Sequence, residues 1–314
     1  MRVLVTGASG FLGAHVAAAC AGAGLRPVAA VRAGSDLRRL RALAGEIDTV
    51  ALDLADPVAA RTALERARAA AVVHCAAYGV DYRQQDAAAA IAINVSGTAA
   101  LIEAAADAGL ARFVHVGTCY EYGDVDAPIP EGAPLCPIGL YAASKAAAAL
   151  IAIDRAAECA LALTVLRPGA MYGPHEGAHK LVPQLLRACM EGEPLPLSSG
   201  TQCRDYVFVA DVADACVRAL AAPATASAAV YNLGSGVATT VRELAARVAA
   251  VCGADGGRLF RWGARADRSR EIRRNILDSA RARADLGWAA STPIEAGVAR
   301  MLAAHGAQRC EDVS

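Results

Sequence analysis

Two groups of residues in this chain have types and spacings that suit chemistry. In the first, Gly7, Gly10 and Gly13 follow the apolar run Val3–Thr6 directly. Such a turn allows a sharp reversal, close approach of backbone to a phosphate and close packing of the following helix, whose first amides are unpaired donors. Because a β-branched run precedes the turn and an apolar helical stretch follows it, the pattern predicts dinucleotide binding and a nicotinamide-type cofactor.

The second group is Tyr141 and Lys145, which lie four residues apart. On a helix this spacing places both side chains on one face. An ammonium group near a phenol lowers the pKa of the phenol, which can then exchange a proton with a substrate hydroxyl or carbonyl while a hydride moves to or from a nicotinamide. The spacing is also common on helix surfaces, but its position downstream of the glycine-rich turn favours a catalytic pair.

Strand and helix patterns alternate along the first half of the chain, which is typical of βαβ units and a parallel sheet. We therefore expect an α/β fold of the Rossmann type, a doubly wound parallel sheet. The expected strands are 3–6, 26–31, 49–52, 71–75, 112–117 and 161–167, and the expected helices are a first one from residue 12, then 57–67, 87–108 and 141–159.

Glycine and proline interrupt the chain beyond Arg167, and arginine becomes dense between Arg258 and Arg283. These features indicate loops between shorter elements. We expect residues 1–172 to form the dinucleotide-binding domain, with 206–222 returning to it, and residues 173–314 to form a smaller substrate-binding lobe.

Composition excludes several classes of function. The 31 basic residues equal the 31 acidic ones, and no basic cluster alternates with aromatics, which argues against nucleic acid as a partner. The ten cysteines are scattered and form no Cys-x-x-Cys pair, so we expect buried free thiols in a reducing cytoplasm and no metal site. We also expect no secretory leader and no membrane span.

Further motifs follow in order along the chain. They are Asp53-Leu54, His74-Cys75-Ala76-Ala77, Asn94-Val95-Ser96-Gly97-Thr98, Tyr172-Gly173-Pro174, Arg204-Asp205-Tyr206, Asn232-Leu233-Gly234-Ser235-Gly236 and Leu286-Gly287-Trp288. With the two groups above, the chain resembles the extended short-chain dehydrogenase/reductase superfamily, in its nucleotide-sugar epimerase/dehydratase/ketoreductase branch. The resemblance covers nearly the whole chain.

The resemblance implies roles for particular residues. A catalytic threonine is expected five residues before Gly123, which is Thr118, so the implied catalytic set is Thr118, Tyr141 and Lys145. Asn94 matches an asparagine that supports the site. The implied cofactor-binding residues are Gly7, Ser9, Gly10, Phe11, Leu12, Gly13, Arg32, Asp53, Leu54, Ala76, Asn94, Tyr141 and Lys145, and the implied substrate-binding residues are Thr118, Cys119, Tyr141 and Arg204.

The chain also departs from part of this branch. The 4,6-dehydratases of the superfamily carry an Asp-Glu pair directly after the catalytic threonine, where this chain has Cys119 and Tyr120. Water elimination would lack its acid and base, which argues against a dehydratase. Cys119 is interpreted as a small residue lining the sugar pocket, with an acid/base role in epimerisation as the alternative, since a reactive thiol needs an activating environment.

Arg32 bears on the choice of cofactor. NAD-binding turns place an acidic residue about twenty positions after the glycines, whereas this chain has an arginine there, which can bind a 2′-phosphate. Ser35 and Arg38 or Arg39 are possible helpers. The sequence therefore favours NADP(H). In the alternative, NAD(H) binds with Arg32 stacked on the adenine and Asp36 on the ribose.

Taken together, these points predict NADPH-dependent reduction of a nucleotide-linked 4-keto-6-deoxysugar at C4. The alternatives are a nucleotide-sugar 4-epimerase with tightly bound NAD and a non-catalytic NADP(H)-binding regulator. Arg204 is expected at the nucleotide end of the substrate, while Lys180, Arg265, Arg268 and Arg270 are weaker candidates that equally suit a solvated basic face. The resemblance further implies a homodimer formed through the helices at 87–108 and 141–159.

Overall fold

The computed structural model describes residues 1–43, 45–223, 228–267 and 269–311. Its larger part is a seven-stranded parallel sheet in the order β11-β7-β5-β4-β1-β2-β3. The strands are β1 (Arg2–Thr6), β2 (Arg26–Val31), β3 (Asp48–Ala51), β4 (Ala71–His74), β5 (Arg112–Val116), β7 (Leu163–Pro168) and β11 (Ala229–Leu233). The expected Rossmann-type fold is confirmed.

The first six strands of this sheet were expected from the sequence to within two residues. The seventh, β11, was not: the sequence analysis assigned its residues to the smaller lobe. β11 pairs with β7 from Ala229 to Leu233 and closes that edge of the sheet. Only this pairing with β7, which is distant in the sequence, places these residues in the large sheet.

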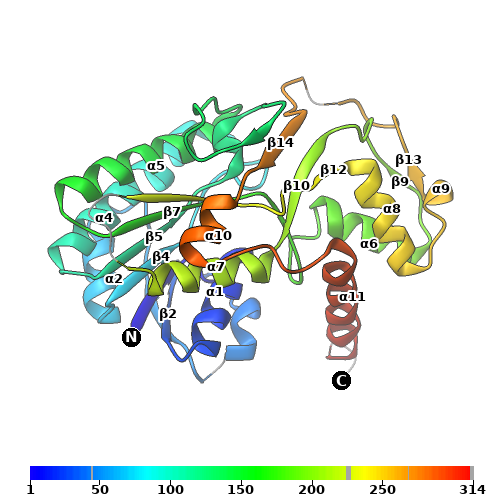
Figure 1. Cartoon of the computed structure of the whole chain (residues 1–314). Coiled ribbons are helices and arrows are strands. Elements are labelled where there is room, and N and C mark those ends of the chain that lie inside the picture. The colour runs from blue at the N-terminus through cyan, green and yellow to red at the C-terminus, as the bar shows by residue number, and fades with distance from the viewer. Residues whose placement is uncertain (44, 224–227, 268, 312–314) are drawn as a thin grey trace.

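Helices cover both faces of the large sheet (Figure 1). Helices α1 (Phe11–Gly22) and α7 (Val209–Ala221) pack on one face, and α2 (Ala59–Ala67), α4 (Gly97–Asp107) and α5 (Leu140–Glu158) on the other. Alternating strand residues point to opposite faces, so Val3 and Val5 belong to the first core and Leu4 to the second.

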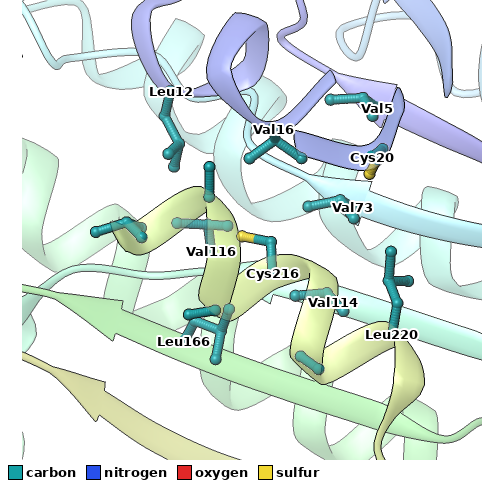
Figure 2. Packing of buried hydrophobic residues seen from close by; sticks show 14 of the residues in the cluster. Val5, Leu12, Val16, Cys20, Val73, Val114, Val116, Leu166, Cys216 and Leu220 are labelled. Carbon is teal, nitrogen blue, oxygen red and sulfur yellow. The ribbon is translucent and has the colours of Figure 1, made fainter. Parts of the chain in front are cut away.

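The core between the sheet and the pair α1 and α7 is built from small residues. Cys20 of α1 and Cys216 of α7 project into it beside Val114 and Leu166 of the strands (Figure 2). Both thiols are fully buried. Among the nine cysteines that the structure describes, all are free, but Cys136 and Cys159 are exposed, so the expectation of uniformly buried thiols was wrong.

The long helix expected at 87–108 is present as one continuous helix from Ala87 to Asp107. Its middle turns are π-helical, so it comprises α3 (Ala87–Ala90), the π-helical turn η2 (Ile91–Ser96) and α4. By length and composition alone, Ala87–Asp107 could cross a membrane, contrary to the sequence-based expectation. Such a helix is weak evidence for a span, and here α4 packs between α2 and α5 with Leu101 and Ile102 fully buried. We therefore interpret it as a helix that packs one side on the core of this domain, with 39% of its apolar window buried.

The smaller lobe contains a second sheet of five strands and a two-stranded pair. The strands are β6 (Pro128–Ile129), β8 (Ala170–Tyr172), β9 (Leu195–Pro196), β10 (Cys203–Phe208), β12 (Ala238–Thr240), β13 (Phe260–Arg261) and β14 (Arg274–Leu277). The helices of this lobe are α6 (Leu181–Glu191), α8 (Val241–Cys252), α9 (Gly256–Leu259) and α11 (Ile294–Glu311). Helix α10 (Ala280–Leu286) instead packs on α7 and β11 of the large sheet. Short 3₁₀ turns, η1 (Arg38–Leu43) and η3 (Cys119–Tyr122), lie elsewhere in the chain.

One acidic side chain organises the junction between the two sheets. The Asp205 carboxylate accepts hydrogen bonds from the backbone amides of Ser235 (2.6 Å), Gly236 (3.0 Å) and Leu277 (3.2 Å). A Cβ on Gly234 would lie 2.2 Å from the same carboxylate. The Arg204-Asp205-Tyr206 and Asn232–Gly236 motifs therefore meet in space, and Asp205 acts there as a structural anchor.

Candidate active site

A cleft runs along the carboxyl edge of the large sheet, beside β1, β2 and β4, where doubly wound sheets bind their ligands. The expected cofactor residues other than Asn94 line this cleft. They are Gly7, Ser9, Gly10, Phe11, Leu12, Gly13, Arg32, Asp53, Leu54, Ala76, Tyr141 and Lys145.

The glycine-rich turn fits a dinucleotide pyrophosphate. Gly7 has φ +63°, and a Cβ there would lie 2.8 Å from the Ala76 backbone. A Cβ on Gly13 would lie 2.1 Å from the Gly7 carbonyl oxygen. Helix α1 starts with Gly10 as N-cap and without a side-chain cap, so its first amides face the cleft as free donors. The turn therefore requires its glycines and offers an anion site.

The adenosine end of the cleft opens into a second hollow lined by Arg32, Ser35, Thr62 and Arg66. Asp53 and Asp56 line it too, but each accepts a hydrogen bond from a nearby backbone amide, at 3.0 Å for Ala55 and 2.9 Å for Val58. In the part of the chain that the structure describes, neither Arg32 nor Arg66 pairs with a carboxylate. Arg66 and Thr62 were missed from the sequence, because only the fold brings α2 beside the end of β2.

The other residues considered for this end lie elsewhere. Arg38 binds Asp36 at 2.7 Å on the exposed surface, and neither side chain lines the cleft. Arg39 donates to the carbonyl oxygens of Ser9 (3.2 Å) and His175 (3.0 Å). Arg39 therefore ties the glycine-rich turn to the loop after β8 and does not line the cleft.

Helix α5 presents Tyr141 and Lys145 to the cleft, as the four-residue spacing predicts. Asn94 does not reach it. Its side chain accepts from the Tyr78 amide (2.7 Å) and donates to the Tyr78 carbonyl (2.9 Å) and the Ser144 hydroxyl (2.8 Å). The expectation of a cofactor contact by Asn94 is therefore corrected: this 1% exposed side chain positions α5 and the loop at Tyr78.

The electrostatics of this pair differ from the expectation. Burial raises the pKa of Tyr141, the nearby Glu121 carboxylate raises it further, and only a hydrogen bond with the Thr118 hydroxyl lowers it. Lys145, 2% exposed, has its pKa lowered to about 8 by burial. Burial outweighs the effect expected from Lys145, so the Tyr141 pKa is raised where the sequence led us to expect a lowered one.

Two buried histidines lie behind Lys145. Lys145 Nζ lies 3.4 Å from His115 Nε2, and the His115 and His74 rings are 5.4 Å apart. Burial lowers the pKa of both rings, that of His74 to about 3. His115 Nδ1 is buried without a hydrogen-bond partner among the described residues. Both histidines are therefore neutral, and neither adds a positive charge beside Lys145.

Thr118 lies at the end of β5, starts η3 and lines a second, larger pocket beside the cleft together with Tyr141. Cys119 does not line that pocket. Its 1% exposed side chain packs with Tyr122, Ile129 and Leu277, and burial raises the pKa of its thiol to about 12. The expected pocket contact by Cys119 is corrected to Tyr120, whose side chain does line it. A protonated, buried thiol also removes the acid/base alternative for Cys119.

The larger pocket lies between the large sheet and the smaller lobe and has a volume of about 640 Å³. Arg204 lines it and binds Glu271 at 2.7 Å, and Lys180 and Arg265 line it as well. Arg268 lies outside the described residues. Arg270 is exposed and does not line this pocket. The pocket thus carries three basic side chains together with apolar groups and the Thr118 and Tyr141 hydroxyls.

Glu176 is a pocket residue that the sequence did not indicate. It lines the larger pocket, and burial raises the pKa of its carboxyl to about 8. One carboxyl oxygen is buried without a hydrogen-bond partner among the described residues. A single glutamate in a loop carries no motif, so only the fold identifies it.

Comparisons with known proteins agree with this geometry. Residues 3–234 match the family described as "NAD dependent epimerase/dehydratase family". The chain is 32% identical over 322 residues to dTDP-glucose 4,6-dehydratase of Streptomyces griseus, covering 96% of this chain and 93% of that one. It is 34% identical over 216 residues to UDP-glucose 4-epimerase of Mycolicibacterium smegmatis, covering 67% of each chain.

Solved structures show the same similarity. A UDP-glucose 4-epimerase of Thermotoga maritima, solved with UDP-glucose, has a TM-score of 0.89 at 25% identity, covering 98% of this chain and all of that one. DesIV of Streptomyces venezuelae, a dTDP-glucose 4,6-dehydratase solved with NAD, has a TM-score of 0.87 at 29% identity, covering 99% and 98%.

Fold and site together define an NAD(P)-dependent enzyme of the extended short-chain dehydrogenase/reductase type. Within that superfamily the chain belongs to the NAD-dependent epimerase/dehydratase family, in the nucleotide-sugar branch.

Proposed function

We propose that this enzyme reduces the C4 carbonyl of a nucleotide-linked 4-keto-6-deoxysugar with NADPH. The observation that carries the choice of cofactor is the hollow beyond the cleft, where Arg32 and Arg66 lie without a carboxylate partner among the described residues. Two guanidinium groups there suit a 2′-phosphate, which the acidic residue of an NAD-type turn would repel. Cys119 and Tyr120 supply no carboxylate for water elimination, which supports a reductase over a dehydratase.

NADPH held in the cleft would provide the hydride that reduces C4. Tyr141 then gives its proton to the carbonyl oxygen, and the Thr118 hydroxyl donates a hydrogen bond to the same oxygen. A raised pKa keeps the Tyr141 phenol protonated at neutral pH, which is the form that a reductive step consumes. Lys145, beneath the phenol on α5, would hold the nicotinamide ribose.

The substrate's diphosphate requires cations in the pocket. Arg204 is the main candidate for this contact, and Lys180 and Arg265 line the same pocket. The structural relatives solved with UDP-glucose or with NAD and TYD are consistent with a nucleotide sugar in this pocket.

The second candidate is a 4-epimerase that keeps NAD bound through oxidation and reduction. The similarity to UDP-glucose 4-epimerases of known structure favours it. An epimerase would retain NAD(H) through purification and turn over without added NADPH, whereas a reductase would release its cofactor.

The first test is a cofactor assay on the freshly purified full chain, followed by NADPH and NADH titrations. We expect cofactor-free protein and tighter binding of NADPH. The variant Arg32→Gln should lose about tenfold or more in NADPH affinity, the loss of one charge-assisted hydrogen bond, with NADH affinity unchanged.

The matched control is Arg38→Gln, because Arg38 is an exposed arginine on the same loop that pairs with Asp36 and lies outside the hollow. It should leave both affinities unchanged. Bound NAD(H) that survives gel filtration would overturn the reductase and support the epimerase. Supplying candidate 4-keto nucleotide sugars would follow a positive result.

We further propose a homodimer formed through α4 and α5. Leu150 on α5 is 56% exposed and Ile91, in the η2 turn before α4, is 55% exposed. Only 39% of the apolar window within Ala87–Asp107 is buried in the single chain, so its remaining apolar surface suits a second copy. We also propose that the protein is located in the cytoplasm.

A further inference from the structure

Glu121 is a fully buried carboxylate directly behind the proposed active site. One oxygen accepts a hydrogen bond from the Thr118 backbone amide at 2.8 Å, and the other accepts from Arg167 Nε at 2.7 Å. A Cβ on Gly117 would lie 2.3 Å from the first oxygen, so the carboxylate occupies space that only a glycine leaves open. The position of Glu121 is therefore determined on three sides.

The partner of Glu121 is itself held in place. Arg167 on β7 is 4% exposed and donates to the Tyr122 hydroxyl at 2.9 Å. That hydroxyl donates to Asn232 Oδ1 at 2.9 Å, and the Asn232 amide donates to the Ile129 carbonyl at 2.8 Å. The network joins β5, β7 and β11, which makes the carboxylate a rigid fixed charge.

The ion pair keeps Glu121 ionised. Burial raises the pKa of this carboxyl, and Arg167, Lys145 and the Thr118 amide oppose the rise. A carboxylate with an arginine at 2.7 Å and a backbone amide at 2.8 Å has both oxygens satisfied. The Glu121 carboxyl group is therefore ionised at neutral pH.

Lys145 is surrounded by few charges. The groups facing it are Glu121, Cys75, His115 and, behind His115, His74. Burial raises the pKa of the Cys75 thiol to about 12 and lowers the pKa of both histidines, so these three are neutral at pH 7. Helix α5, which carries Lys145, packs against the η3 turn, which carries Glu121. The Glu121 carboxylate raises the Lys145 pKa against the effect of burial.

Glu121 also faces the phenol. The groups that raise the pKa of Tyr141 after burial are Glu121, Cys119 and Tyr120, and the Thr118 hydroxyl lowers it. The Cys119 thiol is protonated and burial raises the Tyr120 pKa, so Glu121 supplies the formal negative charge among them.

We propose that Glu121 is a positioning residue of this active site: it holds the Thr118 backbone in place and, as a buried counter-charge, keeps Lys145 protonated beside Tyr141. The inference rests on the roles given to Thr118, Tyr141 and Lys145 under the proposed function. It assigns Glu121 no contact with substrate or cofactor.

The chain contains only two lysines, Lys145 and Lys180, which makes the charge effect directly measurable. In the full-length protein labelled with ¹³C at lysine Cε, NMR would show two side-chain signals, and Lys180→Arg assigns them. We expect Glu121→Gln to lower the midpoint pH of the Lys145 signal by about one unit, because an opposite charge nearby has been removed. A change of packing without loss of the Glu121 charge would not lower the midpoint pH of the Lys145 signal.

Removing one charge of a buried pair endangers folding, so the double variant Glu121→Gln/Arg167→Gln is measured as well. It removes both charges, and since Arg167 is not among the groups that shift Lys145, the same downward shift is expected. The matched control is Glu243→Gln: Glu243 caps Thr240 at the start of α8 in the same capping-box geometry, but on the exposed surface. It should leave the midpoint unchanged.

The effect of Glu121 on the Thr118 backbone is measured separately. Hydrogen exchange of the Thr118 amide should be faster in Glu121→Ala than in the unaltered protein, because the amide loses its acceptor. An unshifted Lys145 midpoint in the two Gln variants, or unchanged Thr118 exchange, would overturn the inference.

These outcomes are separable from the proposed function. Failure of NADPH binding, or full turnover by Tyr141→Phe, would remove the proposed function while leaving the Lys145 midpoint shift intact. Conversely, an inactive Tyr141→Phe with an unshifted midpoint in Glu121→Gln would remove only this inference.

Discussion

At the scale of single residues, hydrogen bonds with the hydroxyl groups of Thr6 and Thr98 determine the protonation state of the buried His74. The Ala76 amide donates to Thr6 Oγ1 (3.2 Å), which donates in turn to His74 Nδ1 (2.7 Å). On the other side, Thr98 Oγ1 donates to the Asn94 carbonyl (2.6 Å), so His74 Nε2 must donate to Thr98 (3.0 Å). The ring is therefore neutral with its proton on Nε2.

This arrangement predicts acid sensitivity. The pKa of His74 is lowered to about 3, while in the unfolded chain it is near its ordinary value, so the unfolded state binds an extra proton between these values. Stability is then lost as pH falls below about 6.5, by about 2 kcal/mol from His74 on reaching pH 5.

Urea unfolding at pH 7 and pH 5 measures this loss. His74→Asn, which cannot titrate in this range, should show a smaller difference between the two pH values than the unaltered protein. An equal difference in both proteins would mean that His74 does not contribute. His115, also neutral and buried, adds to the loss, whereas Glu176, whose pKa is raised to about 8 in the folded state, opposes it. The difference between the two proteins therefore isolates the contribution of His74.

At the scale of elements, the π-helical turn η2 and helix α5 are joined by one amide side chain. Asn94 accepts one hydrogen bond and donates two, to partners in the Tyr78 loop and at Ser144, and Ser144 donates to the Tyr141 carbonyl at 3.0 Å. The helix carrying Tyr141 and Lys145 is thereby aligned with the wall of the cofactor cleft.

We expect Asn94→Ala to lower the free energy of unfolding by about 1–3 kcal/mol, because buried partners lose their hydrogen bonds. NADPH affinity should fall as well, since the Tyr78 loop lines the cleft. Asn94→Asp keeps the acceptor but not the donors and should be at least as destabilising. Urea unfolding and NADPH titration check both variants, and unaltered values for Asn94→Ala would contradict the positioning role.

At the scale of the whole molecule, residues of both lobes line the larger pocket, whereas α4 and α5 lie on the face of the large sheet opposite α1 and α7 (Figure 1). On that face, Leu150 of α5 and Ile91 of the η2 turn before α4 are exposed. If a second copy covers that face, Leu150→Glu places a charge in an apolar contact and should yield monomers. Sedimentation velocity on the full chain gives the mass directly.

The control for this prediction is Met190→Glu, a 38% exposed apolar residue on helix α6 of the smaller lobe, which should leave the dimer intact. Unaltered protein that sediments as a monomer would remove the dimer. Equal dissociation by both variants would point to general destabilisation.

Local patterns in the sequence were sufficient for much of the large sheet and for the cofactor cleft. The glycine-rich turn and the spacing of Tyr141 and Lys145 depend on a strand–turn–helix unit and on one helical turn, both of which neighbouring residues determine. The cleft accordingly contains the residues expected to line it, except Asn94. The seventh strand was missed, because its place in the large sheet depends on pairing with β7, which is distant in the sequence.

The features of the fold and site that were not predicted depend on contacts between residues that are distant in the sequence. Arg167 and Glu121 are 46 positions apart, and only the pairing of β5 with β7 brings them together. The direction of the Tyr141 pKa depends on how completely several elements exclude water from the phenol, which no spacing of two residues can express. The sequence by itself determined the cofactor class and the order of the first strands, through short-range geometry. The tertiary structure decided which polar groups are buried, and therefore which of them are charged.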